Sequence, residues 1–160
     1  MNAAQVRQIR LSHIAMIPQG AMNSLNPVVR IRDQMILTMR EHGADGTAAE
    51  MLGRVAELLE KVGLQADVGN RYPHELSGGM KQRVCIAQAI SLGPKLILAD
   101  EPTGNLDPDL SLDIMNLFRR LNEVGVTMLI ATHDLTLLEQ LDGRKIELAN
   151  GEIIGRGNST

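Results

Sequence analysis

The sequence predicts an α/β protein built around parallel strands. Two short and mainly aliphatic runs, at 96–99 and 126–131, have the composition of strands that are buried on both faces. Between them, residues 108–121 place apolar side chains at every third or fourth position, which is typical of a helix that packs one face on a sheet. A strand, a helix and a second strand in this order indicate a right-handed parallel crossover.

Length and composition limit the classes of protein that this chain can belong to. Its 160 residues are enough for one domain with a hydrophobic core, and 44% hydrophobic and 22% charged residues are ordinary values for a globular protein. The aromatic residues are Tyr72 and Phe118, so the core must be aliphatic and rich in the nine methionines. The low aromatic content and a net charge of −3 argue against a nucleic-acid partner. A single cysteine, Cys85, excludes an internal disulfide and indicates buried packing inside a helix.

The first half of the chain is predicted to be mainly helical. In chain order we expect a polar helix or tail over 1–12, a strand over 13–17, a loop over 18–30 and a helix over 31–40. A second helix over 47–62, a loop over 64–75 and a third helix over 80–91 follow. Pro18 ends the strand because proline lacks the N–H that a ladder needs. Thr47 and Glu50 have the spacing of a capping box, and Gly63 suits the position just after the helix end.

The second half completes the sheet and adds a hairpin. Asp107 is expected to cap the helix over 108–121, with Pro108 at its first position. After the second buried strand we expect a short helix over 135–141, two edge strands over 145–148 and 152–154, and a frayed tail over 155–160. Asn150-Gly151 between the two edge strands is a hairpin signal, because both residues tolerate a positive φ.

Two short polar segments contain groups that could bind a metal ion, water or an anion. Asp100 and Glu101 stand at the tip of a buried strand, where one carboxylate can hold Mg²⁺ and the other can handle water. Ser77, Gly78 and Gly79 open a helix, and such a turn offers free backbone N–H groups to an anion. Each segment alone has a simpler explanation, since many Asp-Glu pairs are solvated loop residues and Ser77 is a good helix cap. Their order along the chain makes the pair informative.

Together with Gln19 upstream and His133 downstream, these segments resemble the nucleotide-binding subunit of an ATP-binding cassette (ABC) transporter. The resemblance covers residues 13–157. It implies an α/β fold made of a partial P-loop NTPase (RecA-like) core with parallel strands and the α-helical subdomain of the ABC family. The implied division has three parts. Residues 1–19 are the Q-loop strand of the core, 20–92 are the helical signature subdomain, and 93–160 are the half of the core with Walker B, D-loop and switch histidine.

The resemblance also implies the roles of single residues. Glu101 and His133 would be catalytic, with Glu101 receiving a proton from the attacking water and His133 contacting the γ-phosphate. Asp100, in the Walker B segment, and Gln19, in the Q-loop, would hold Mg²⁺. Asn105, Leu106 and Asp107 would form the D-loop. The nucleotide, ATP, would be contacted by residues of the Q-loop, signature segment and D-loop, namely Gln19, Ser77, Gly78, Gly79, Gln82 and Asp107.

The implied activity is ATP hydrolysis coupled to solute transport, with import of a peptide or a related small solute as the expected form. Residues 22–27 and 72–76 resemble the ATPases of dipeptide, oligopeptide and nickel importers. Residues 100–107 and 121–134 are more similar to cell-division and lipoprotein-release ATPases. The implied partners are a second nucleotide-binding subunit in a head-to-tail dimer and membrane permease subunits. A cytoplasmic location at the inner face of the membrane, reached through the permeases, follows from these partners.

One expected motif is not in the sequence. No segment matches Gly-x-x-x-x-Gly-Lys-[Ser/Thr], the P-loop that grips the β- and γ-phosphates. We therefore expect the chain by itself to bind ATP weakly or not at all, to be inactive as an ATPase, and to self-associate through an incomplete core. Two alternatives stay open. The chain is a non-catalytic module that lends its signature loop to a complete partner, or it is a truncated gene product.

Overall fold

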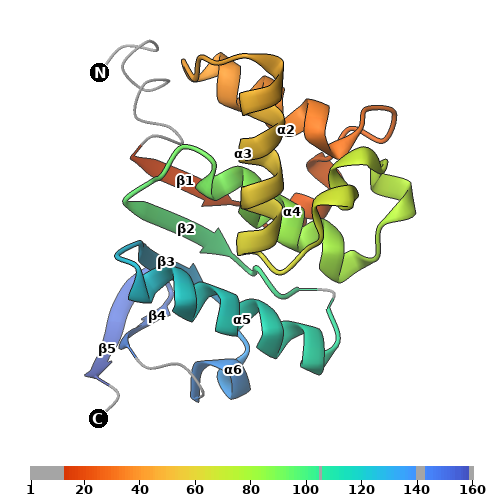
Figure 1. Cartoon of the computed structure of the whole chain (residues 1–160). Helices are drawn as coiled ribbons and strands as arrows, with labels where there is room; N and C mark the ends of the chain where they lie inside the picture. Colours follow the sequence, from red (N-terminus) through yellow and green to blue (C-terminus); the bar gives the residue numbers. More distant parts are fainter. Residues whose placement is uncertain (1–12, 105, 140–142, 159–160) are drawn as a thin grey trace.

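A computed structural model describes residues 13–104, 106–139 and 143–158 (Figure 1). Its centre is a three-stranded parallel sheet of β1 (Ile14–Ile17), β2 (Leu96–Asp100) and β3 (Thr127–Ala131), in the order β1-β2-β3. Ile17, Ala99 and Ile130 share one row of the sheet, so the three strands end at nearly the same level. The sequence-based expectation of parallel pairing around β2 is confirmed.

A helical segment of the chain separates β1 from β2. It consists of η1 (Ala21–Ser24), α2 (Ile31–Glu41), α3 (Ala48–Lys61), η2 (Ala66–Asn70), η3 (Pro73–Glu75) and α4 (Gly78–Ile90). Figure 1 shows α2, α3 and α4 gathered at one end of the molecule, with the sheet in the middle. None of the helices in the described part of the chain has the length and apolar character that a membrane crossing requires.

Local capping chemistry sets the ends of these helices. Thr47 and Glu50 make both hydrogen bonds of the predicted capping box, and Gly63 follows α3 with a φ of 76°. Helix α4 begins at Gly78 rather than at Met80, because the Ser77 hydroxyl accepts the Met80 amide and thereby adds the two glycines to the first turn.

The remaining elements are α5 (Pro108–Glu123), α6 (Leu135–Glu139), β4 (Arg144–Ala149) and β5 (Glu152–Asn158). Strands β4 and β5 form an antiparallel hairpin whose turn residues, Asn150 and Gly151, have φ values of 51° and 82°. Two expectations were wrong here. The hairpin is a separate two-stranded sheet rather than an edge of the main one, and 155–158 belong to β5 rather than to a frayed tail. Backbone pairing with 144–147 orders this glycine-rich stretch, which lacks the side-chain pattern of a strand.

The two faces of the main sheet are unequal. One face presents Ala15, Ile17, Ile97 and Ala99, all at most 3% exposed, to a core that includes side chains of α4 and α5. On the opposite face Ile14, Met16 and Leu129 are 38%, 59% and 56% exposed. The prediction that the strands are buried on both faces was therefore wrong for β3, in which every residue is exposed or half-buried. An apolar run predicts two-sided burial, but the covering elements must come from elsewhere in the structure.

Candidate functional site

The predicted site residues of the sheet lie at the carboxyl ends of its three strands. Gln19 follows β1, Asp100 ends β2 with Glu101 directly after it, and His133 follows β3. Because the strands are parallel and in register, these residues leave the sheet at the same edge, which is where open α/β sheets bind ligands. Gln19 is exposed in the turn after Pro18, whose carbonyl accepts the Ala21 amide at 3.0 Å.

Glu101 is the most tightly held of these side chains. Its Oε1 accepts the backbone N–H of His133 at 2.9 Å and lies 2.7 Å from the ring nitrogen Nδ1 of the same residue. Its Oε2 accepts the hydroxyl of Thr132 at 3.2 Å. The Glu101 side chain is 18% exposed, whereas that of His133 is 90% exposed. The segment directly after β3 thus supplies all of these contacts to a carboxylate that follows β2.

The backbone of Glu101 is unusual as well. Its φ of 44° lies in the left-handed region, which a residue with a Cβ adopts only when its surroundings enforce it. The Glu101 N–H donates to the Ala131 carbonyl at 2.9 Å, and the Glu101 carbonyl accepts the Gly104 amide at 3.0 Å. The strand ladder before Glu101 and the turn after it therefore enforce this conformation.

Hydrogen bonding shifts the pKa values of Glu101 and His133 in opposite directions. Partial burial pushes the pKa of Glu101 upward, but the hydrogen bonds from His133 and Thr132 outweigh it and bring that pKa below its usual value. The hydrogen bond to Glu101, and then the charge of that carboxylate, raise the pKa of His133. Each shift favours the charged form of its own group, the carboxylate of Glu101 and the imidazolium of His133.

Asp100 offers the exposed carboxylate of the site. It is the last residue of β2 and pairs with Ala131 in the ladder. Among the described residues, no group of three or more acidic, histidine or cysteine side chains has the arrangement of a closed metal site. Mg²⁺ is usually held by one or two carboxylates, with water and phosphate oxygens completing the shell. An exposed Asp100 at a strand end fits that donor chemistry, and so does the amide oxygen of Gln19.

The predicted anion-binding turn caps α4 and packs against the start of α5. Ser77 is exposed, and its hydroxyl accepts the Met80 amide at 3.3 Å. A Cβ on Gly79 would lie 3.1 Å from the side chain of Leu110, so a larger residue here would require the Leu110 side chain to shift. Gly78 is exposed. The turn therefore leaves Ser77 and Gly78 accessible, while Gly79 packs against Leu110 at the start of α5.

Two further predicted site residues make hydrogen bonds inside the protein. Asp107 caps α5 by accepting the Leu110 amide at 2.9 Å, as its sequence position predicts. Gln82 is 3% exposed and donates its side-chain amide to the carbonyl of Pro102 at 2.7 Å. The amide of Gln82 thus contacts the segment directly after Glu101, and the expected contact of Gln82 with the nucleotide stays a prediction. Asn105, which we expected in the D-loop, lies outside the described residues.

Sequence reasoning missed Thr132 as a member of the site. A threonine at the end of an apolar run is an ordinary strand residue, and its hydroxyl meets Glu101 only because β3 lies beside β2. Its position one residue before His133 was the only signal that the sequence offered.

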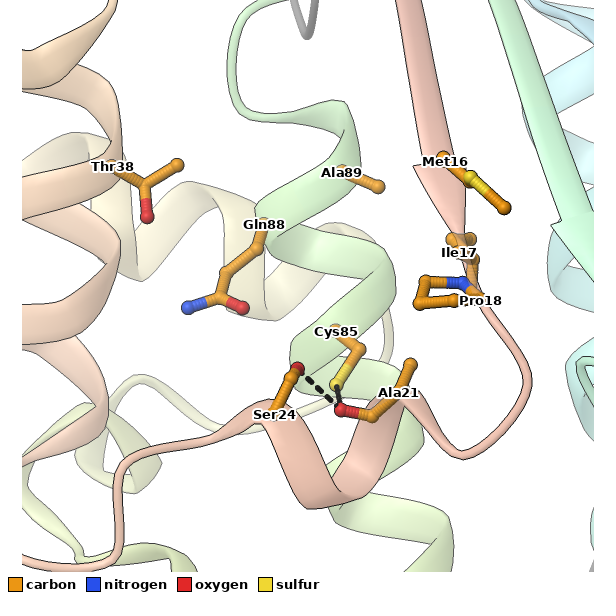
Figure 2. A pocket seen from close by; sticks show the side chains of 9 residues that line it. All are labelled: Met16, Ile17, Pro18, Ala21, Ser24, Thr38, Cys85, Gln88 and Ala89. Carbon is orange, nitrogen blue, oxygen red and sulfur yellow. Dashed lines mark hydrogen bonds between the residues drawn. The ribbon is translucent and has the colours of Figure 1, made fainter.

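A small hollow lies beside the turn that carries Gln19 (Figure 2). It has a volume of about 190 Å³, and its lining comes from the end of β1, η1, α2 and α4: Met16, Ile17, Pro18, Ala21, Ser24, Thr38, Cys85, Gln88 and Ala89. The Ser24 hydroxyl and the Cys85 thiol both donate to the Ala21 carbonyl, at 2.6 and 3.3 Å. Burial raises the pKa of Cys85 to about 12, so the thiol packs as a neutral group, as the sequence predicts.

Comparisons with known proteins identify the family of this chain. The model of the ABC transporter family matches residues 1–104. The chain is 43% identical over 132 residues to YkfD of Bacillus subtilis, named as an oligopeptide transport ATP-binding protein, and this match covers 82% of the chain and 40% of YkfD. It is 50% identical over 101 residues to the cell division ATP-binding protein FtsE of Streptococcus pneumoniae, over 63% of the chain and 44% of FtsE.

Solved structures extend the likeness to the fold. The dimeric ABC transporter cassette MJ0796 matches with a TM-score of 0.83 and 32% identity, over 99% of this chain and 68% of the cassette. A second structure of MJ0796 represents a post-hydrolysis state with ADP and Pi bound. This chain spans less than half the length of the curated relatives named above. The chain belongs to the ABC transporter family and has the α/β fold of its ATP-binding cassette, a P-loop NTPase fold.

Proposed function

We propose that this chain provides the water-handling carboxylate and the signature turn of an ABC ATPase. The complete assembly would couple ATP hydrolysis to the import of a peptide or a related small solute. The observation that carries the proposal is Glu101, an ionised carboxylate at a strand end that His133 and Thr132 hold with three contacts. The similarity to YkfD supports peptide import, and the similarity to FtsE makes a cell-division system the competing assignment.

The residues at the sheet edge would divide the reaction between them. Bound ATP and Mg²⁺ would supply the phosphoryl group and neutralise part of its charge. Glu101, whose pKa is lowered by the hydrogen bonds from His133 and Thr132, would orient the attacking water and accept its proton. His133, whose side chain is 90% exposed, would donate a hydrogen bond from a ring N–H to the terminal phosphate. Asp100 and Gln19 would hold the metal, and Asp107 would lie near the nucleotide at the subunit boundary.

The signature turn would act on a nucleotide held by a second subunit. Ser77 and Gly78 are exposed at the N-terminus of a 13-residue helix, where backbone N–H groups and the helix dipole favour an anion. MJ0796 is dimeric, which supports a head-to-tail pair of subunits. Since no P-loop motif occurs among these 160 residues, the phosphates would have to be gripped by a P-loop outside this sequence.

The hollow beside Gln19 is our proposed contact for a permease subunit. Its lining joins the end of β1 to α2 and α4, so a permease segment seated there would touch both the sheet and the helical segment. This arrangement supports the division into a Q-loop strand at 1–19, a helical subdomain at 20–92 and a second half of the core at 93–160. It would bring the chain to the inner face of the membrane through its partner.

A non-catalytic module that lends its signature turn to a complete partner is the second candidate. It is favoured by the lack of a P-loop motif in the sequence, and it requires Ser77 and Gly78 but not Glu101. A variant pair therefore separates the two functions. Gly78→Asp would introduce a carboxylate where a phosphate should bind, whereas Glu101→Gln would remove only the proton acceptor.

The test is complementation of this chain with a separate ABC-family fragment that contains the P-loop motif Gly-x-x-x-x-Gly-Lys-[Ser/Thr]. We expect the chain alone to give no detectable heat with Mg·ATP in calorimetry, and the mixture to hydrolyse ATP. Glu101→Gln should abolish hydrolysis and keep nucleotide binding, while Glu123→Gln, an exposed carboxyl at the end of α5, should leave both unchanged. Hydrolysis that survives Glu101→Gln would refute the catalytic proposal. Loss of partner binding in Gly78→Asp alone would favour the second candidate.

A further inference from the structure

Thr132 connects the proposed base to the turn after β3. Its Oγ1 lies 3.2 Å from Oε2 of Glu101 and 3.1 Å from the backbone nitrogen of Asp134. The side chain is half-buried at the end of the strand, between these two partners. The two contacts together determine which way the hydroxyl proton points.

The direction of each hydrogen bond follows from the groups involved. A backbone N–H can only donate, so the Thr132 oxygen accepts from Asp134. An ionised carboxylate can only accept, so the single hydroxyl proton goes to Glu101. The result is a chain of donors that runs from the Asp134 amide through the Thr132 hydroxyl to Oε2 of Glu101. Donors aligned in one sense strengthen one another.

The first donor of this chain is itself held in place. Oδ1 of Asp134 accepts the amides of Thr136 and Leu137, at 3.0 and 3.2 Å, and so caps α6. This cap fixes the backbone of Asp134 and with it the N–H that orients Thr132. The beginning of α6 thus supports the Glu101 carboxylate, which follows strand β2.

The contact from Thr132 differs from the ring contact of His133. The His133 ring is on a side chain that is 90% exposed, and turning it toward a phosphate would break its 2.7 Å contact with Oε1. Two donors would then remain on Glu101, the His133 amide on Oε1 and the Thr132 hydroxyl on Oε2. Each carboxylate oxygen of Glu101 would then keep one donor.

We propose that Thr132 is a positioning residue, whose hydroxyl, oriented by the Asp134 amide, fixes Oε2 of Glu101 whichever way the His133 ring points. This inference rests on the proposed role of Glu101 toward the attacking water. With Oε2 fixed, the remaining lone pairs of the carboxylate keep one direction through the reaction, which is what positioning of a reactive group requires. The inference applies to the chain without nucleotide as well as to the assembled enzyme.

The first test uses NMR of the 160-residue chain without nucleotide. Thr132→Val removes the hydroxyl and keeps the shape, whereas Thr132→Ser keeps the hydroxyl. In the valine variant the Asp134 amide should exchange with solvent about tenfold faster, and the couplings of the Glu101 side chain should show averaging between rotamers. The serine variant should match the wild type. Thr38→Val, which removes a hydroxyl bonded to a helix carbonyl in α2, should leave the Glu101 signals unchanged.

The second test is kinetic and uses the complementation assay described above. Thr132→Val should lower kcat about tenfold to a hundredfold with KM unchanged, and Thr132→Ser should restore most of the rate. An ordered Glu101 in the valine variant would overturn the inference, and so would an unchanged kcat or an equal rate loss in both Thr132 variants. If the wild-type mixture shows no Glu101-dependent hydrolysis while NMR shows the hydroxyl holding Glu101, the proposed function fails and the contact itself stands.

Discussion

Gln82 provides the sharpest test of the structure against the sequence-based expectation. Its side chain is 3% exposed, and its amide donates to the Pro102 carbonyl at 2.7 Å. The substitution Gln82→Met keeps the length and fills the space, but leaves that carbonyl without this donor. An unsatisfied buried acceptor costs about 1–3 kcal/mol, of which the more apolar methionine recovers a part. We therefore expect a loss of about 1–2 kcal/mol in the free energy of unfolding.

Urea and thermal unfolding followed by circular dichroism measure this loss directly. In a domain of this size, 1–2 kcal/mol corresponds to a fall in Tm of about 2–8 °C. Gln88→Met is the matched control, because Gln88 lies on the same helix, is half-buried and faces the hollow of Figure 2. This variant should change the stability by no more than about 0.5 kcal/mol.

The outcome separates two roles of Gln82. If the side chain contacts nucleotide, as the family resemblance implies, Gln82→Met should leave the free chain as stable as the wild type and weaken only ATP binding in the assembled enzyme. Equal losses in Gln82→Met and Gln88→Met would also refute the reasoning, since they would show that the helix tolerates neither methionine for reasons unrelated to Pro102.

Four further predictions follow from the described residues. The NMR titration midpoint of His133 should lie above its usual 6.5 and return toward that value in Glu101→Gln. The contribution of this pair to stability should be complete between about pH 4.5 and 6.5, and should decline as pH rises through the raised pKa of His133 or falls through the lowered pKa of Glu101. Thr47→Ala should cost about 1 kcal/mol in urea unfolding, because α3 loses its capping box. Light scattering should show self-association of the wild-type chain and less of it in Leu129→Lys, since Leu129 is 56% exposed; a wild-type monomer at high concentration would contradict this.

The parts of the fold that the sequence predicted correctly depend on short-range chemistry. Thr47 with Glu50, Asp107 with Leu110, and the Asn150-Gly151 turn each act within four residues, so their partners are visible in the sequence. The placement of Asp100 and Glu101 at a strand tip belongs to the same class. An apolar run and the polar residue that ends it are adjacent in the chain.

The errors share a different cause. The exposed face of β3, the separate sheet of β4 and β5, and the ordering of 155–158 all depend on which elements lie side by side. Periodicity reports that a side chain is apolar, but it does not report whether another element covers it. Backbone pairing likewise orders a strand whose side chains carry no pattern.

The sequence by itself determined the class of this protein, its family resemblance and the residue types at the ends of the strands. Tertiary structure alone decided what those residues touch. It directs Gln82 inward to Pro102, 20 positions away, and it joins Glu101 to Thr132 across 31 positions. A hydrogen bond needs its donor and acceptor within about 3 Å, and only the packing of α4 on the core and of β3 beside β2 brings such distant groups that close.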